Sequence, residues 1–393
     1  MARAVRILAG RSPGEIRVAL LDVDDRLLEA WVERGGASGG VGDLHRARVT
    51  ARAPAMAGAF VLLGGGGTGF LPEKDVPGQS GDLLQEGRVL HVRVSRAAQG
   101  GKGPRVSARL DRTEEARATK AATDAPGTVP RRLARGPDAA MRLALSYPDA
   151  VVETDAPAIA ARLRAALGPD RVLFSGAAPV FDDGLEAEWD ALALAEAPLP
   201  GGGRMLVQPT AALTAIDVDA GAVVGGRDRT AQARFNAGAV AEAARQIRLR
   251  NLAGPLLLDV AGLGRRERER LAQPLAQALA GDPLVRLLGL GPLGLFEMQR
   301  RRVHPPLHEV FGWPPSPLTH GLAALRRAAR DVAASPGRPP LALRAAPTVA
   351  AALAGAGEAM REMAEAAGRP LQLRADTAVA PGNEVLEETG DGR

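Results

Sequence analysis

The sequence predicts a multidomain α/β protein that carries one small β-barrel. Its 393 residues exceed what one ordinary hydrophobic core accommodates, so two or three domains are expected. Residues 206–260 show strand, helix and strand patterns in that order, which is typical of a βαβ unit. Residues 45–110 instead show short β-patterned runs separated by glycine-rich turns, which indicate a barrel.

Composition restricts the class of protein. A content of 46% hydrophobic and 24% charged residues describes a globular chain. The chain has no cysteine, which excludes disulfides and thiolate metal sites. It also lacks an apolar run of bilayer length, and residues 1–15 are too interrupted for a signal peptide, so we expect a cytoplasmic protein without a membrane partner. A net charge of +5 is compatible with a polyanionic partner but is too mild to identify one.

The first and middle segments mix strand and helix patterns. Residues 15–33 alternate apolar and polar side chains and predict two short antiparallel strands that turn at Asp24 and Asp25. Residues 111–135 have the composition of a linker or a frayed helix. Residues 131–200 alternate helix and strand, with a capped amphipathic helix at 155–168 and a strand at 171–176.

The C-terminal segment predicts a further small α/β unit. Helix patterns cover residues 319–335 and 346–368. Strand-like runs lie between and after them, at residues 341–345 and 371–375.

Two aromatic residues stand out in the barrel segment. Phe60 and Phe70 are two of only seven phenylalanines in the chain. On an OB-type barrel, exposed rings beside a basic side chain stack nucleic-acid bases, each stacked base contributing roughly 1–3 kcal/mol. An equally compatible interpretation is that both rings fill the barrel core.

The βαβ-patterned segment contains a long helix. Residues 235–254 read as a helix with a polar, arginine-bearing face and a stop signal at Gly254 and Pro255. Its small and apolar side chains lie at Val240, Ala243, Ala244 and Ile247.

Acidic residues close both strands of that segment. The first apolar run ends in Asp217 and Asp219, and the second ends in Asp259. Because a βαβ connection can bring two strand ends together, Asp217 and Asp259 are predicted to meet at one edge of a sheet. Such a pair of carboxylates is a suitable binding site for a hard divalent cation. The alternative is that these residues cap helices or solvate turns.

Long strings of the sequence resemble the ribonuclease E/G family. EIRVALLD, AGAFVLLG, GTGFLP, LLQEG and GGKG follow one another within residues 15–110. LTAIDVDAG, FNAGAVAEAARQIRLRNLAGPLLLDV and LGLFEMQRRR follow within residues 206–302, where the similarity is strongest.

This resemblance implies a domain order. It assigns a ribonuclease H-like domain to residues 1–35 and 131–200, with an OB-fold RNA-binding domain inserted at 36–110 and a linker at 111–130. A deoxyribonuclease I-like catalytic domain then covers residues 201–312, and a small C-terminal α/β domain covers 318–388.

The resemblance also implies RNA-contacting residues. Phe60, Phe70 and Lys102 occupy the positions that grip single-stranded RNA, with the rings stacking bases and the lysine facing a phosphate. Lys102 is one of only three lysines in the chain. Arg245 and Arg248 are candidates to face phosphates, the alternative being ordinary solvated helix charges.

A magnesium site at Asp217 and Asp259 is implied in the same way. The ion would orient and acidify a water that attacks the phosphodiester. Three departures from the family pattern bear on it. Asp219 replaces a usual asparagine, which either adds a ligand or repels the phosphate. Gly262 stands where another aspartate is common, and GPLG at 291–294 has lost the arginine of an SRFG-like turn.

Some family segments have no counterpart in the sequence. The segment that recognises a 5′-monophosphate is missing, so we expect little preference for monophosphorylated ends. The cysteine pair that shares zinc between subunits is also missing, so a zinc-linked tetramer is not expected and a monomer or homodimer is. The long scaffold tail that recruits partner proteins has no counterpart either.

The resemblance therefore implies a magnesium-dependent endoribonuclease that cuts single-stranded RNA in ribosomal RNA processing or messenger RNA turnover. The alternative is a non-catalytic RNA-binding protein, which Asp219, Gly262 and the 291–294 turn favour. A third hypothesis is a ribosome-associated structural factor that needs no metal.

Overall fold

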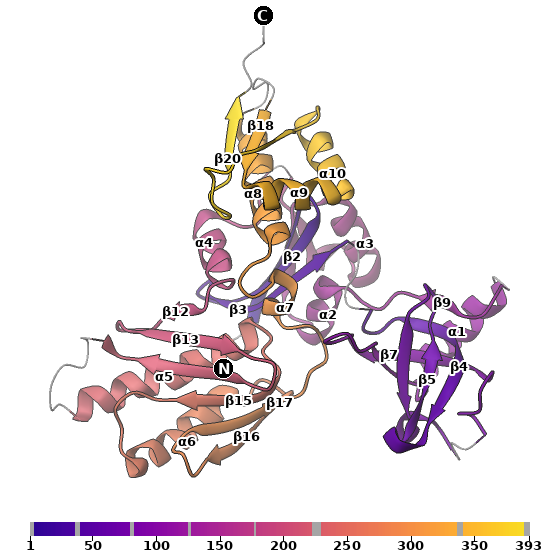
Figure 1. Cartoon of the computed structure of the whole chain (residues 1–393), viewed down its shortest axis with the longest axis horizontal. Coiled ribbons are helices and arrows are strands. Elements are labelled where there is room, and N and C mark those ends of the chain that lie inside the picture. The colour runs from indigo at the N-terminus through magenta and orange to yellow at the C-terminus, as the bar shows by residue number, and fades with distance from the viewer. Residues whose placement is uncertain are drawn as a thin grey trace, which may run out of the picture. The chain divides into compact units, whose positions relative to one another are not determined.

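The computed structural model describes residues 4–35, 40–78, 82–124, 127–176, 178–221, 229–335 and 341–388. The chain forms two compact units (Figure 1). Unit 1 comprises Met1–Gly36, Ala139–Arg301 and Pro306–Arg393, and unit 2 comprises Ala37–Asp138 and Arg302–Pro305. The fold is mixed α/β, as the sequence predicts.

Unit 2 contains a closed five-stranded barrel. Its strands are β4 (Leu44–Ala53), β5 (Gly58–Leu62), β6 (Thr68–Pro72), β7 (Val89–Arg96) and β8 (Arg105–Ser107). They run in the order β5-β6-β8-β7-β4, and pairing of β5 with β4 closes the ring. Alternate residues such as Val49, Val61 and Val92 point inward and form its core. This architecture is consistent with the predicted OB-like fold.

A helix and a sixth strand complete unit 2. Helix α1 (Arg112–Asp124) follows the barrel, and β9 (Arg131–Ala134) pairs with β4. Of the two alternatives for residues 111–135, a helix is present at Arg112–Asp124. Glu114 and Glu115 hold it to the barrel, because they bond to Arg93 Nη1 at 2.9 Å and His91 Nδ1 at 3.0 Å. Short 3-10 turns lie at Pro54–Met56 and Glu73–Asp75.

Unit 1 begins with a five-stranded sheet in the order β11-β10-β1-β2-β3. The strands are β1 (Ala4–Ser12), β2 (Glu15–Asp22), β3 (Leu27–Arg34), β10 (Val151–Thr154) and β11 (Val172–Phe174). The predicted antiparallel pair is confirmed as β2 and β3, with Asp25 in a left-handed turn conformation at φ 58°.

Helices cover both faces of that sheet. Ile7 and Ala9 of β1 pack with α2 (Ala139–Ser146) and α3 (Pro157–Leu167), whereas Leu8 packs with α4 (Asp183–Ala191) and α7 (Leu307–Phe311). Side chains of consecutive strand residues point to opposite faces of the sheet. Residues 7–9 of β1 are therefore all buried only because helices cover both faces. The predicted helix at 155–168 is confirmed as α3, but its N-cap residue is Ala156 and no side chain caps it. The carboxylate of Asp155 accepts from Arg11 N and Val180 N.

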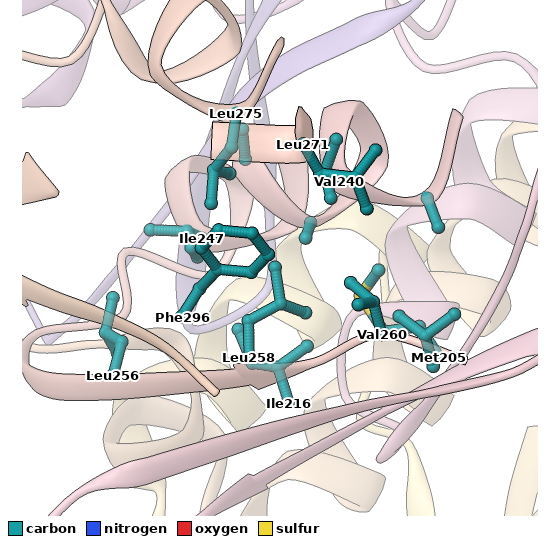
Figure 2. Close-up of a cluster of buried hydrophobic side chains, with 14 of the residues drawn as sticks. Met205, Ile216, Val240, Ile247, Leu256, Leu258, Val260, Leu271, Leu275 and Phe296 are labelled. Carbon is teal, nitrogen blue, oxygen red and sulfur yellow. The ribbon is translucent and has the colours of Figure 1, made fainter. Parts of the chain in front are cut away.

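The second sheet of unit 1 has six strands in the order β12-β13-β14-β15-β17-β16. Their bounds are β12 (Glu196–Pro198), β13 (Arg204–Pro209), β14 (Thr214–Asp219), β15 (Gly254–Asp259), β16 (Val285–Leu290) and β17 (Phe296–Arg300). Helices α5 (Arg229–Leu249) and α6 (Arg265–Leu279) pack together on the same apolar cluster (Figure 2). The predicted βαβ unit is therefore confirmed as β14-α5-β15 with parallel strands. The predicted inward residues of α5 are all buried, namely Val240, Ala243, Ala244 and Ile247.

Helix α5 ends earlier than predicted. Asn251 adopts a left-handed conformation at φ 48°, and its N–H bonds to Arg248 O while Leu252 N bonds to Ile247 O. This pair of bonds is a Schellman cap, which terminates the helix. Gly254 and Pro255 are the first residues of β15, so the predicted stop signal belongs to the strand.

The C-terminal part of unit 1 forms a small α/β layer. It contains α8 (Pro317–Ala334), α9 (Pro347–Gly355) and α10 (Gly357–Ala367) on a three-stranded sheet ordered β19-β18-β20. The strands are β18 (Leu341–Ala345), β19 (Gln372–Ala375) and β20 (Val385–Glu388). The predicted helix at 346–368 is thus two helices, and β20 is a strand that the sequence did not predict. In the described part of the chain, no helix combines the length and apolarity needed to cross a membrane.

Candidate functional site

The six-stranded sheet has one covered face and one face open to solvent. Ile216 and Val218 of β14, and Leu256 and Leu258 of β15, are buried against α5 and α6. Because strand side chains alternate, the residues between them point to the opposite face. On that face Gln208, Asp217 and Gln299 are exposed.

The two predicted metal ligands lie side by side on the open face. Asp217 and Asp259 are direct partners in the parallel register of β14 and β15, so their side chains project from neighbouring strands in the same direction. The βαβ connection has brought the two strand ends together as predicted. The arrangement concentrates negative charge at one point of the sheet edge.

Burial and the neighbouring charges together raise the pKa of Asp217. Partial burial, followed by the charges of Asp259 and Asp219, raises the pKa of the Asp217 carboxyl, and Arg204 acts in the opposite direction. Each of the three raising effects disfavours the ionised form. A cation at the pair would relieve the repulsion between the carboxylates.

Asp219 has its own neutralising partner. Its Oδ2 bonds to Nε of Arg204 at 3.1 Å, and its Oδ1 accepts from Gly221 N at 2.9 Å. The bond from Gly221, and then that from Arg204, lowers the pKa of Asp219. Arg204 is the register partner of Asp219 on β13. The carboxylate of Asp219 is therefore charge-compensated within the sheet.

Asp259 is contacted by an arginine that sequence reasoning missed. Nη1 of Arg268, on the first turn of α6, lies 2.6 Å from Oδ1 of Asp259. The same guanidinium donates to Gly294 O at 2.8 Å and to Leu263 O at 2.9 Å. A signal was present in the sequence, because α6 opens with RRER, and arginines are unfavourable at the positive end of a helix.

The donor set fits magnesium in number and chemistry. Mg²⁺ is commonly held by one or two carboxylates and keeps several of its waters. Asp217 offers its carboxylate to solvent, and Asp259 offers the oxygen that Arg268 does not bond. Within the described residue ranges, no cluster of three or more His, Asp or Glu side chains able to hold a metal is found.

Gly262 and the 291–294 turn, the other two departures from the expected pattern, both make local contacts. Gly262 has a left-handed φ of 61°, and a Cβ there would lie 2.1 Å from Gln232 Nε2, which bonds to Gly262 O at 2.7 Å. A side chain at this position would be strained. The 291–294 turn is tied to α6, because Arg265 donates to Gly291 O at 3.3 Å and Arg268 donates to Gly294 O.

The barrel places its two phenylalanines together on the outer surface. Phe60 and Phe70 are register partners on β5 and β6, with ring centroids 5.6 Å apart in an edge-to-face arrangement. Phe60 is 36% exposed, whereas its strand neighbours Ala59 and Val61 are fully buried. The core alternative is therefore wrong for Phe60. Phe70 is partly exposed.

Lys102 lies close to the same strand. It is exposed in the turn that pairs it with Gln99, and the next residue, Gly103, approaches the first residue of β6. A Cβ on Gly103 would lie 1.8 Å from Thr68 O, so glycine is required for this close approach. The lysine thus stands beside the strand that carries Phe70.

Arg245 and Arg248 serve another purpose than the predicted phosphate contact. Arg245 bonds to Glu242, Glu188 and Leu27 O, and Arg248 bonds to Glu29 and the hydroxyl of Tyr147. Both side chains are 17% exposed. They join α5 to the first sheet and its helices, so neither phosphate contact nor free solvation describes them.

The fold and the paired aspartates define a multidomain α/β protein with an OB-like barrel and an acidic site on an open sheet face. The sequence model described as "Ribonuclease E/G family" matches residues 156–303, which include both aspartates. Over this stretch the chain is therefore similar to the ribonuclease E/G family.

Two individual relatives extend over most of the chain, and a third is more similar over a shorter stretch. Ribonuclease G of Haemophilus influenzae is 26% identical over 402 aligned positions, covering 78% of this chain and 82% of that protein. Ribonuclease E of Escherichia coli is 26% identical over 387 positions, covering 75% of this chain but only 36% of that protein. Ribonuclease E of Nostoc sp. is 37% identical over 121 positions, covering 29% of this chain and 17% of that protein.

Proposed function

We propose that the protein is a magnesium-dependent endoribonuclease acting on single-stranded RNA. The observation that supports it most is the in-register pair of Asp217 and Asp259 on an open sheet face. Relatives over most of the chain bear the names ribonuclease G and ribonuclease E. Processing of ribosomal RNA or turnover of messenger RNA is the cellular role that we propose with it.

In this proposal Asp217 and Asp259 hold one Mg²⁺. The bound ion would acidify a water and offset charge on the phosphodiester. Phe60 and Phe70 stack bases, since their rings are neighbours on the outside of the barrel. Lys102 supplies a point charge for a backbone phosphate beside them.

A cleavage assay tests the proposal. A labelled, unstructured AU-rich RNA is incubated with the full chain, with and without Mg²⁺. We expect internal cuts that require the cation and that Asp217→Asn abolishes while RNA affinity is largely retained. Asp170→Asn, an exposed carboxylate outside the sheet, is the matched control and should cut normally. Cleavage by the Asp217→Asn variant would refute the metal assignment.

A second candidate is an RNA-binding protein that does not cut. It is favoured by the arginines at the site, because Arg268 already pairs with Asp259 and Arg204 with Asp219. The same assay separates the two proposals. Binding that weakens with salt but produces no cuts at any Mg²⁺ concentration supports the second candidate.

A further inference from the structure

Helix α6 begins with an unusual charge pattern. Its first four residues are Arg265, Arg266, Glu267 and Arg268. The first turn of a helix carries partial positive charge, so arginine is electrostatically unfavourable there and acidic residues are favoured. A local arrangement that departs from helix preference points to a role outside the helix.

Arg268 is held by three partners in the structure. Two are backbone carbonyls, Leu263 O two residues before α6 and Gly294 O in the 291–294 turn. The third is Oδ1 of Asp259. Only 17% of the Arg268 side chain is exposed, against 46% for Asp259. The two carbonyl bonds anchor the guanidinium independently of the carboxylate, so the positive charge stays at the site whatever Asp259 binds.

We infer that Arg268 is a built-in competitor for the divalent cation at Asp217 and Asp259. This inference rests on the metal site of the proposed function and names the residue that sets its affinity. The guanidinium occupies one of the two oxygens of Asp259 and offsets part of the repulsion between the carboxylates. It also repels a second cation at contact range.

If Arg268 mainly positioned Asp259, it would raise the affinity of the site for the cation and not lower it. Partners that orient a ligand commonly raise metal affinity by about 10- to 100-fold. Here, however, the partner of the ligand is itself a fixed cation, and each positive charge weakens the binding of the other. The site therefore binds a divalent cation weakly by itself. An RNA phosphate restores negative charge, so cation and RNA each tighten the binding of the other.

Direct cation titration tests the inference without using activity. Mn²⁺ binding to the full chain is measured by electron paramagnetic resonance in the absence of RNA. We expect Arg268→Gln to tighten the Asp217-dependent site by about five- to tenfold, since screening at a half-exposed carboxylate limits the effect. Arg268→Lys keeps the charge and should bind as the wild type does. Arg270→Gln, an exposed arginine of the same helix, removes the same charge away from the site and should change nothing.

The outcomes are distinguishable. Unchanged or weaker Mn²⁺ binding by Arg268→Gln overturns the competitor role and leaves the metal site standing. If Arg268→Gln does not fold, Arg268→Lys alone decides, because a positioning role predicts a loss of about 10-fold or more in that variant. If no variant shows Mn²⁺ binding that Asp217→Asn abolishes, the metal site and the inference both fall.

Discussion

Replacement of Asp217 by asparagine is predicted to stabilise the cation-free protein at neutral pH. The pKa of this carboxyl is raised above its ordinary value of 3.8, so the folded state favours the protonated form. Between that ordinary value and the raised pKa, the folded state retains a proton that the unfolded state has lost. Stability therefore falls as pH rises through this window and remains reduced at pH 7. Asparagine does not titrate and escapes the loss.

The expected gain is modest because the carboxylate is mostly exposed. A full pKa unit corresponds to about 1.4 kcal/mol, and screening by solvent lowers the effect here to roughly 0.3–1 kcal/mol. For a folded region as large as unit 1, this gain in the free energy of unfolding corresponds to an increase in melting temperature of about 1–3 °C.

Calorimetry with EDTA at several pH values measures the effect. The gain of Asp217→Asn over wild type should be present at pH 7 and shrink as the pH is lowered toward 4. Asp170→Asn, exposed and outside the sheet, should show no comparable gain. Equal or lower stability of Asp217→Asn at pH 7, or a gain that grows as pH falls, would refute the raised pKa that partial burial and the neighbouring carboxylates give Asp217.

Three other substitutions separate RNA contact from structural support. Phe60→Ala should weaken single-stranded RNA binding by roughly 1–3 kcal/mol with little change in stability, as measured by filter binding and thermal denaturation. Arg245→Met should leave RNA affinity unchanged but cost roughly 2–3 kcal/mol in urea denaturation, because buried Glu242 would lose one of the two arginines, Arg26 and Arg245, that pair with it among the described residues. Reduced RNA affinity in a folded Arg245→Met protein would restore the phosphate-contact interpretation. Leu258→Ala, at a fully buried position, should cost about 2–5 kcal/mol, and a smaller loss would contradict the packing between the sheet and α5.

Local patterns predicted much of the architecture. The period-2 alternation at residues 15–33 gave the β2–β3 pair, and the helical spacing of Val240, Ala243 and Ile247 gave the buried face of α5. These predictions succeeded because burial on one face imposes the period of the element on the sequence. The end of α5 was missed because its Schellman cap uses Asn251, whereas the pattern pointed to the glycine three residues later.

The site was only partly accessible from sequence. The βαβ order predicted that Asp217 and Asp259 could meet at one sheet edge, since a parallel connection returns the chain to the same edge, and the register of β14 and β15 confirms it. The βαβ order did not predict which other side chains would contact the aspartates. Arg204 contacts Asp219 across an antiparallel strand pair, and Arg268 reaches Asp259 from a helix.

The other candidate site residues also divide into those that the sequence predicted and those that only the tertiary structure placed. The sequence by itself determined an α/β chain with a barrel and two adjacent aspartates. Only the tertiary structure decided that Phe60 lies outside the barrel and that Arg245 joins α5 to the first sheet. The physical reason is that periodicity records which side of an element is buried, whereas the partner of a charged side chain depends on elements that are distant in the chain and meet only on folding.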